Sequence, residues 1–162
     1  MSETYHNRAS TTTGSFTGRE QTTIREAIGL LESRLRVTEA FTSPTMVKDY
    51  CRLQLSVEKD EYFGCLFLDT KHRLLMFERL FRGTIDGASV HPRVVVRRAL
   101  ELNAAATIFT HNHPSGMSEP SRDDINITNR LREALALVDV RVLDHVVVAV
   151  DGSTSMAECG LV

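Results

Sequence analysis

A chain of 162 residues is long enough for one domain with a buried core, and its 42% hydrophobic and 25% charged residues are ordinary for a globular protein. The formal net charge of −2 argues against a protein built mainly to bind nucleic acid, because such domains usually carry a basic excess. No apolar run approaches the roughly 20 residues of a membrane helix, and the N-terminus lacks the apolar core of a secretory signal. We therefore expect a cytoplasmic protein without a membrane partner.

Cysteine usage supports the same location. Cys51, Cys65 and Cys159 are odd in number and widely spaced, and no CxxC pair is present. This pattern favours neither a thiolate zinc site nor a disulfide framework, and it is typical of a reducing compartment. Cys65 lies in an apolar run, so we expect a small buried side chain there rather than a catalytic thiol.

The N-terminal part of the chain is expected to be a tail followed by two helices. Residues 1–17 are rich in Ser, Thr and Gly, which predicts disorder. Apolar residues then recur at helical spacing over about 19–36, so residues 18–42 should hold one helix and a linker. Ser43 and Pro44 combine a helix cap with proline at the first helical position, which predicts the start of a second helix. The residues expected on its buried side are Met46, Val47, Tyr50 and Leu53.

The remainder of the chain alternates strands and helices. The expected strands cover residues 61–69, 74–81, 104–110 and 140–150, and further helices begin at His91-Pro92 and Pro120-Ser121. In the helix after His91, the residues expected on the inner side are Val95, Val96, Ala99 and Leu100. Asp151 and Gly152 form a hairpin turn signal, after which the tail should add a short edge strand. The resulting order, ααββαβαββ, predicts a mixed α/β fold with a mainly antiparallel sheet flanked by helices, rather than a doubly wound sheet.

Two histidines and an aspartate form the most informative pattern in the sequence. His111 and His113 follow an apolar strand and are separated by one residue, so their side chains should point the same way. Asp124 lies in the first turn of the next helix and comes close to them if the intervening loop folds back. Two nitrogens and one carboxylate oxygen leave a fourth tetrahedral position for water, which is the arrangement of a catalytic zinc site. We therefore expect these three residues to hold a metal ion.

Each of these residues also has an ordinary structural interpretation. A lone pair of histidines can simply line a polar loop, and Ser121 and Asp124 have the spacing of a capping box at a helix start. The capping roles and the metal role are compatible, because a capping box fixes the geometry of the carboxylate. The full pattern, HxHP followed at a fixed distance by SxxD, favours the metal site over the polar loop.

The HxHP…SxxD run resembles the JAB/JAMM (MPN+) metalloprotease motif, and Glu61-Tyr62-Phe63-Gly64 is similar to the ExxG segment that this motif has upstream. Five stretches resemble the RadC family more narrowly, namely LFLDTKHRLL, FRGTIDGASVHPR, NAAATIFTHNHPSG, PSRDD and RVLDHVVV. The resemblance covers about residues 40–162 and is highly specific. The chain is similar to the short RadC-like proteins, and the helix-hairpin-helix module of longer members is not evident in it.

This resemblance implies a RadC-like JAB/MPN catalytic domain over residues 43–162, with a cytidine-deaminase-like architecture. It implies one Zn²⁺ per chain on His111, His113 and Asp124, and it implies that Glu61 is the general acid/base that moves a proton from water to the leaving amine. It also implies that Ser121 donates a hydrogen bond to the oxyanion of the tetrahedral intermediate. The implied activity is that of a zinc metalloprotease or isopeptidase acting on a peptide or protein substrate of unknown identity.

Other functions and partners stay open at this point. The same ligands and a glutamate can activate water against a phosphodiester, so a DNA-repair factor of the RadC type or a metal-dependent nuclease is one alternative, although the net charge does not indicate DNA binding. A non-catalytic binding module is another. Asp144 and His145 lie among apolar strand residues, and they either orient a metal-binding histidine or form an internal pair without a catalytic role. An exposed strand edge near the C-terminus would allow a homodimer.

Overall fold

The structure is a computed structural model that describes residues 16–37, 40–83, 89–114 and 116–162. Within these ranges the helices are α1 (Gly18–Val37), α2 (Pro44–Leu55), α3 (Pro92–Glu101) and α4 (Arg122–Ala136). The strands are β1 (Tyr62–Leu68), β2 (Leu74–Arg82), β3 (Ala106–His113), β4 (Arg141–Ala149) and β5 (Gly152–Ser155). Their order is the one that the sequence predicts, and none of these helices is long and apolar enough to cross a membrane. The predicted disordered tail lies outside the described residues, except for its last two positions.

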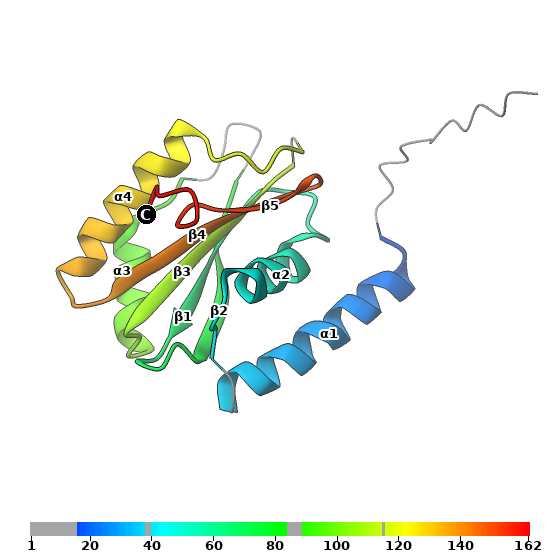
Figure 1. The fold of residues 1–162 in the computed structure, drawn as a ribbon, viewed down its shortest axis with the longest axis horizontal. Helices are drawn as coiled ribbons and strands as arrows, with labels where there is room; N and C mark the ends of the chain where they lie inside the picture. The colour runs from blue at the N-terminus through cyan, green and yellow to red at the C-terminus, as the bar shows by residue number, and fades with distance from the viewer. Residues whose placement is uncertain (1–15, 38–39, 84–88, 115) are drawn as a thin grey trace, which may run out of the picture.

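The strands form one sheet in the order β2-β1-β3-β4-β5 (Figure 1). β1 pairs antiparallel with both β2 and β3, and β4 pairs antiparallel with β5 across the turn predicted at Asp151. β3 and β4 run parallel, because α4 carries the chain back along the sheet between them. The sheet is mainly antiparallel and helices flank it, so the predicted fold class is confirmed.

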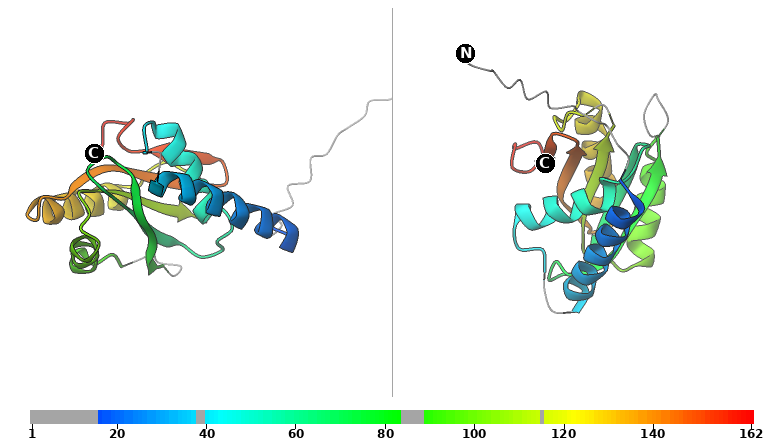
Figure 2. Two further views of the ribbon diagram at one scale, coloured as in Figure 1. Left: turned by 90° about the horizontal axis from the view of Figure 1, so that it is seen from below. Right: turned by 90° about the vertical axis from the view of Figure 1, so that its right-hand side faces the viewer.

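Helices cover both faces of the sheet (Figure 2). α1 and α2 pack on one face, and α3 and α4 pack on the other. Because side chains alternate along a strand, the neighbours Leu66 and Phe67 of β1 are both fully buried but contribute to different cores. Cys65 is also fully buried, as expected, and burial raises the pKa of its thiol well above the usual value. This burial from two sides explains why β1 reads as a continuous apolar run.

The C-terminal half of α1 docks on α2. Leu35 is 2% exposed and belongs to the core that lies between the sheet and helices α1 and α2. Glu32 accepts hydrogen bonds from the Tyr50 hydroxyl at 2.9 Å and from the Gln54 side-chain amide at 3.1 Å. Burial, together with the Glu32 carboxylate, raises the pKa of Tyr50 well above its usual range, so the phenol keeps the proton that it donates. α1 therefore packs on the rest of the fold, while the domain boundary expected near residue 43 stays a prediction.

Parts of the predicted helix faces are wrong. Leu100 is expected on the inner side of α3, but it is 56% exposed, because it is rotated about 100° around the helix from the buried Ala99. In α2, Met46 and Leu53 are only half-buried and lie at the rims of the buried stripe. The buried residues of α2 are Val47, Tyr50, Cys51, Gln54 and Leu55. A polar glutamine is tolerated inside because its amide is hydrogen-bonded to Glu32 and to the Tyr50 hydroxyl.

Candidate metal centre

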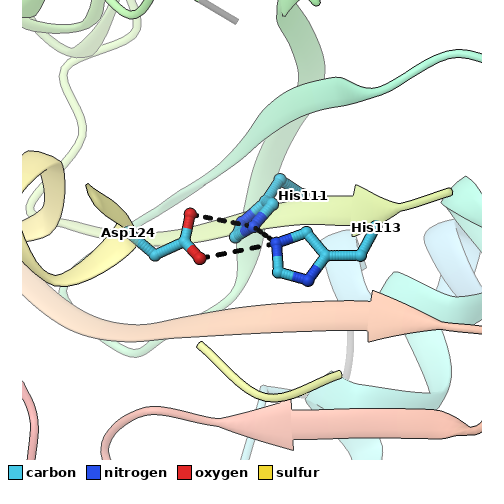
Figure 3. Close-up of side chains that lie close together, drawn as sticks. All are labelled: His111, His113 and Asp124. Carbon is cyan, nitrogen blue, oxygen red and sulfur yellow. Dashed lines mark hydrogen bonds and ion pairs between the residues drawn. The ribbon is translucent and has the colours of Figure 1, made fainter. Parts of the chain in front are cut away.

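Two elements bring the three predicted ligands together. His111 and His113 end β3 and point to the same side of the sheet, and Asp124 comes from the first turn of α4 (Figure 3). The two Nε2 atoms of the histidines lie 2.7 Å apart. Oδ1 of Asp124 lies 3.1 Å from Nε2 of His111, and its Oδ2 lies 3.4 Å from Nε2 of His113. The loop after β3 separates Asp124 from the two histidines in the sequence, but the three side chains face one another around a common point. One ligand atom from each lies within 4.8 Å of the others.

A capping box at the start of α4 fixes the carboxylate of Asp124. Oδ2 accepts hydrogen bonds from the backbone N–H and from the hydroxyl of Ser121, both at 2.7 Å. In return the Ser121 hydroxyl oxygen accepts the backbone N–H of Asp124 at 3.1 Å. These bonds occupy Oδ2 and leave Oδ1 directed at His111. The capping role expected of both residues is present, and it orients the carboxylate toward the histidines.

The hydrogen bonds of His113 expose its ligand nitrogen. Nδ1 lies 2.8 Å from the backbone carbonyl of Met117, and a carbonyl can only accept, so Nδ1 carries a proton. In the neutral ring, Nε2 is then a bare lone pair that faces His111 and Asp124. When the ring is protonated, Nε2 donates to Asp124, and this hydrogen bond raises the pKa of His113 against the opposing effect of burial, so protons and a metal ion compete for this nitrogen.

The electrostatics of the cluster fit a divalent cation. Burial by itself would raise the pKa of Asp124, but the facing His111 and His113, together with Ser121, outweigh burial and hold that pKa well below its usual range. Asp124 is therefore an anion, and this half-buried carboxylate faces two imidazole nitrogens. Two imidazoles and one carboxylate are a donor set that suits Zn²⁺, and related divalent metals accept the same ligands.

Glu61 lies beside this cluster, at the residue before β1. It is half-buried and lines the same cavity, of about 520 Å³, as the three ligands and Ser121. Among the described residues no hydrogen bond or ion pair engages its carboxylate. The side-chain amide of Asn112 holds the backbone on either side of Glu61, because it donates to the Asp60 carbonyl and accepts from the Tyr62 N–H, both at 2.8 Å. The predicted acid/base residue thus sits on a fixed backbone, and its carboxylate is hydrogen-bonded to none of the described residues.

Asp144 and His145 point to opposite faces of β4 and play different parts. Oδ2 of Asp144 accepts from the Ser155 hydroxyl at 2.6 Å, and its Oδ1 accepts from the Ala157 N–H at 2.9 Å. Asp144 therefore fastens the C-terminal turn to the sheet. His145 instead contacts a predicted ligand, since its Nε2 lies 2.8 Å from Nδ1 of His111. The internal pair that the sequence allows is present only through the backbone, because the His145 N–H donates to Oδ1 of Asp144 at 2.7 Å while the two side chains bind other residues.

The second ring nitrogen of His145 has a partner that no motif in the sequence marks. Its Nδ1 lies 2.6 Å from the hydroxyl of Thr128, which is fully buried. Burial, and then the nearby His111, lower the pKa of His145 well below the usual value, so the ring is neutral. The available signal was a polar residue at a buried position of α4, four residues after Asp124.

The chain is similar to known proteins over most of its length. The family model for the RadC-like JAB domain matches residues 41–161. A UPF0758 protein of Azotobacter vinelandii is 61% identical over 130 residues, which are 80% of this chain and 58% of that protein. One from Methylibium petroleiphilum is 63% identical over 131 residues, covering 81% and 59%. The chain thus spans less than three fifths of the length of these bacterial relatives. With three quarters of its length matched, as the resemblance in the sequence implied, the chain belongs to the family of RadC-like JAB domains.

Proposed function

We propose that this chain is a zinc-dependent hydrolase that cleaves peptide or isopeptide bonds. The observation that supports this proposal is the convergence of two imidazole nitrogens and one carboxylate at a cavity whose wall also carries Glu61, a carboxylate that no described residue hydrogen-bonds. His111, His113 and Asp124 would hold the metal, and three protein ligands leave one coordination position open. A bound divalent cation would supply water that is acidic enough to act as a nucleophile at neutral pH.

Glu61 moves the proton in this mechanism. Its carboxylate faces the cavity without a competing partner among the described residues, so it accepts a proton from the attacking water and passes it to the departing amine. Asn112 contributes by holding the peptide groups on both sides of Glu61. A general base needs this fixed placement, because proton transfer requires the two heavy atoms to be within hydrogen-bonding reach.

Ser121 and the start of α4 stabilise negative charge as it develops on the substrate. The Ser121 hydroxyl donates to Oδ2 of Asp124 in this structure, so it must rotate away to donate to an oxyanion. Oδ2 then keeps the hydrogen bond from the Ser121 backbone N–H. The positive end of the α4 dipole lies at the same place and favours negative charge there.

The charges around the cavity favour a peptide over a nucleic acid. Among the described residues that line the cavity, Glu61, Asp123 and Asp124 are acidic and Arg130 is the one arginine. A bound divalent cation would offset the charge of Asp124, but Glu61 and Asp123 would still repel a phosphodiester backbone, which carries a negative charge at every step, whereas a peptide bond is neutral. The net charge of −2 also gives no long-range attraction for DNA.

The direct test uses Glu61→Gln in the zinc-loaded chain, with a degenerate peptide library and an isopeptide-linked peptide as substrates. Wild type should contain about one zinc ion per chain by elemental analysis and cleave one of these substrates, with products identified by mass spectrometry. Glu61→Gln should keep its zinc and lose cleavage, while Glu133→Gln, an exposed glutamate on α4, should keep both. Unchanged cleavage in Glu61→Gln would assign the base to another residue. Hydrolysis of a DNA duplex run alongside, with no peptide cleaved, would show a nuclease instead.

A further inference from the structure

A chain of hydrogen bonds runs beneath the candidate metal centre, away from the cavity. Nδ1 of His111 lies 2.8 Å from Nε2 of His145, and Nδ1 of His145 lies 2.6 Å from the hydroxyl oxygen of Thr128. The Thr128 hydroxyl in turn donates to the backbone carbonyl of Asp124, 2.5 Å away in the preceding turn of α4. His111 is 2% exposed and the other two are fully buried, so bulk water offers these groups no alternative partner.

The direction of every hydrogen bond in this chain follows from the last one. The Thr128 and Asp124 oxygens lie 2.5 Å apart, a distance that needs a proton between them, and a backbone carbonyl has none to donate, so the single hydroxyl proton of Thr128 points to Asp124 rather than to His145. The Thr128 oxygen therefore accepts the proton on Nδ1 of His145. Nε2 of the neutral His145 must then accept from Nδ1 of His111, which leaves Nε2 of His111 as a bare lone pair.

We infer that Thr128 and His145 are positioning residues that hold His111 in the tautomer and orientation required of a metal ligand, an inference that rests on the metal site proposed above. Metal-ligating histidines usually donate their second ring N–H to a carboxylate, a backbone carbonyl or a water molecule, and this bond fixes the tautomer and the orientation of the ring. Here the acceptor is another imidazole, which has two tautomers of its own. The Thr128 hydroxyl selects the one that accepts from His111.

The alternative tautomer shows why this selection matters. With its proton on Nε2, His145 would donate to Nδ1 of His111, and the proton of a neutral His111 would have to lie on Nε2. That proton would occupy the nitrogen that faces Asp124 and His113, where the metal is expected. The buried hydroxyl therefore decides whether the ligand nitrogen is available.

Asp124 connects both ends of this arrangement. Its Oδ1 faces Nε2 of His111 at 3.1 Å, and its backbone carbonyl receives the Thr128 hydroxyl. The capping box holds the same residue at the start of α4. Residues from β3, β4 and α4 are thus joined in one closed set of contacts, so the positions of two predicted ligands depend on each other.

Packing alone does not account for polar side chains at these positions. The ring of His145 makes edge contacts with Phe63 and Phe109, with centroids 5.4 and 5.9 Å away. An apolar side chain could fill such surroundings without needing any hydrogen bond, whereas a buried imidazole needs both of its nitrogens satisfied. A packing role depends on the shape of Thr128 and His145, while a positioning role depends on the hydroxyl and the ring nitrogens.

Thr128→Val separates these two roles, because valine has the shape of threonine without the hydroxyl, and Thr128→Ser is the matched control that keeps it. The zinc dissociation constant of each folded variant is measured by competition with a chromophoric chelator. We expect zinc affinity to fall about 10–100-fold in Thr128→Val and to stay within about threefold of wild type in Thr128→Ser. Equal affinity of Thr128→Val and wild type would overturn the inference, as would an equal loss in both variants.

A second measurement does not depend on zinc or on any variant. In metal-free wild type labelled with ¹⁵N-histidine, nitrogen chemical shifts report which ring nitrogen carries the proton. His111 and His145 should each be protonated on Nδ1, and His111 protonated on Nε2 alone would overturn the inference. Wild type without zinc affinity would refute the proposed metal site but leave this tautomer test valid, so the two failures can be told apart.

Discussion

Asp124 both caps α4 and faces the proposed metal position, and one substitution can remove the second role while keeping much of the first. Its Oδ2 closes the capping box with Ser121, and its Oδ1 faces His111. Asparagine at this position keeps an oxygen that can accept the Ser121 N–H, so the variant should lose less than the roughly 1 kcal/mol of a complete cap deletion. The amide carries no negative charge and is a poor ligand for zinc. Asp124→Asn should therefore fold and bind zinc weakly.

Because zinc binds only the folded chain, the zinc-dependent stabilisation of wild type and of Asp124→Asn follows from their dissociation constants. Free zinc at 100 times the dissociation constant stabilises the folded chain by about 2.7 kcal/mol. Removing a group that only hydrogen-bonds a ligand weakens binding about 10–100-fold, so removing the ligand should weaken it at least about 100-fold. The same zinc concentration then stabilises Asp124→Asn by only about 0.4 kcal/mol. At about 2–4 °C per kcal/mol for a domain of this size, zinc should raise Tm by roughly 5–11 °C in wild type and by about 1–2 °C in the variant.

Thermal unfolding followed by circular dichroism, at a buffered free zinc concentration, measures both shifts. Asp123→Asn is the matched control, because it removes one negative charge from the same helical turn at an exposed position. It should keep most of the zinc-dependent shift. A shift in Asp124→Asn as large as that of wild type would refute the assignment of Asp124 as a ligand. The absence of any shift in wild type would refute the metal site as a whole.

Three further predictions concern the scaffold. Gly64→Ala should destabilise the fold by about 1–3 kcal/mol in chemical denaturation, because a Cβ there would lie 2.9 Å from the Phe77 ring; unchanged stability would mean that the ring moves aside freely. Leu35→Ala should lower the unfolding free energy by about 2–4 kcal/mol, and a negligible loss would mean that α1 is undocked in solution. Burial alone would raise the pKa of Asp69, but hydrogen bonds from Arg73 and Lys71 hold that pKa below the usual value of an aspartate. The stability that Asp69 contributes is therefore present above the usual pKa and is lost as pH falls through the lowered one. Asp69→Asn should therefore lose less stability than wild type on acidification below about pH 4, and parallel pH profiles of the two proteins would contradict this.

Local signals in the sequence were sufficient wherever short-range physics decides the structure. Proline after a capping serine marked the start of α2, and the spacing of Ser121 and Asp124 marked the capping box of α4, because a cap involves only the first turn of a helix. The order of helices and strands followed from apolar periodicity for the same reason. The placement of His111 and His113 on one side of β3 followed from the alternation of side chains along a strand.

Long-range contacts could not be obtained in this way. His145 follows His111 by 34 residues, and it lies beneath that histidine only because β4 pairs in parallel with β3 in a particular register. Thr128 reads as one more residue of a buried stripe until the packing of α4 against β4 puts its hydroxyl beside His145. The hold of Asn112 on the backbone around Glu61 likewise depends on β1 and β3 being neighbours.

The sequence by itself therefore determined the elements, the fold class and the residue types of the candidate metal centre, because propensity, periodicity and capping act over a few residues. The tertiary structure alone decided which polar groups support those ligands and which helix residues are buried. These outcomes depend on strand register and on helix rotation against the sheet, and a shift of one residue in either would exchange buried side chains for exposed ones.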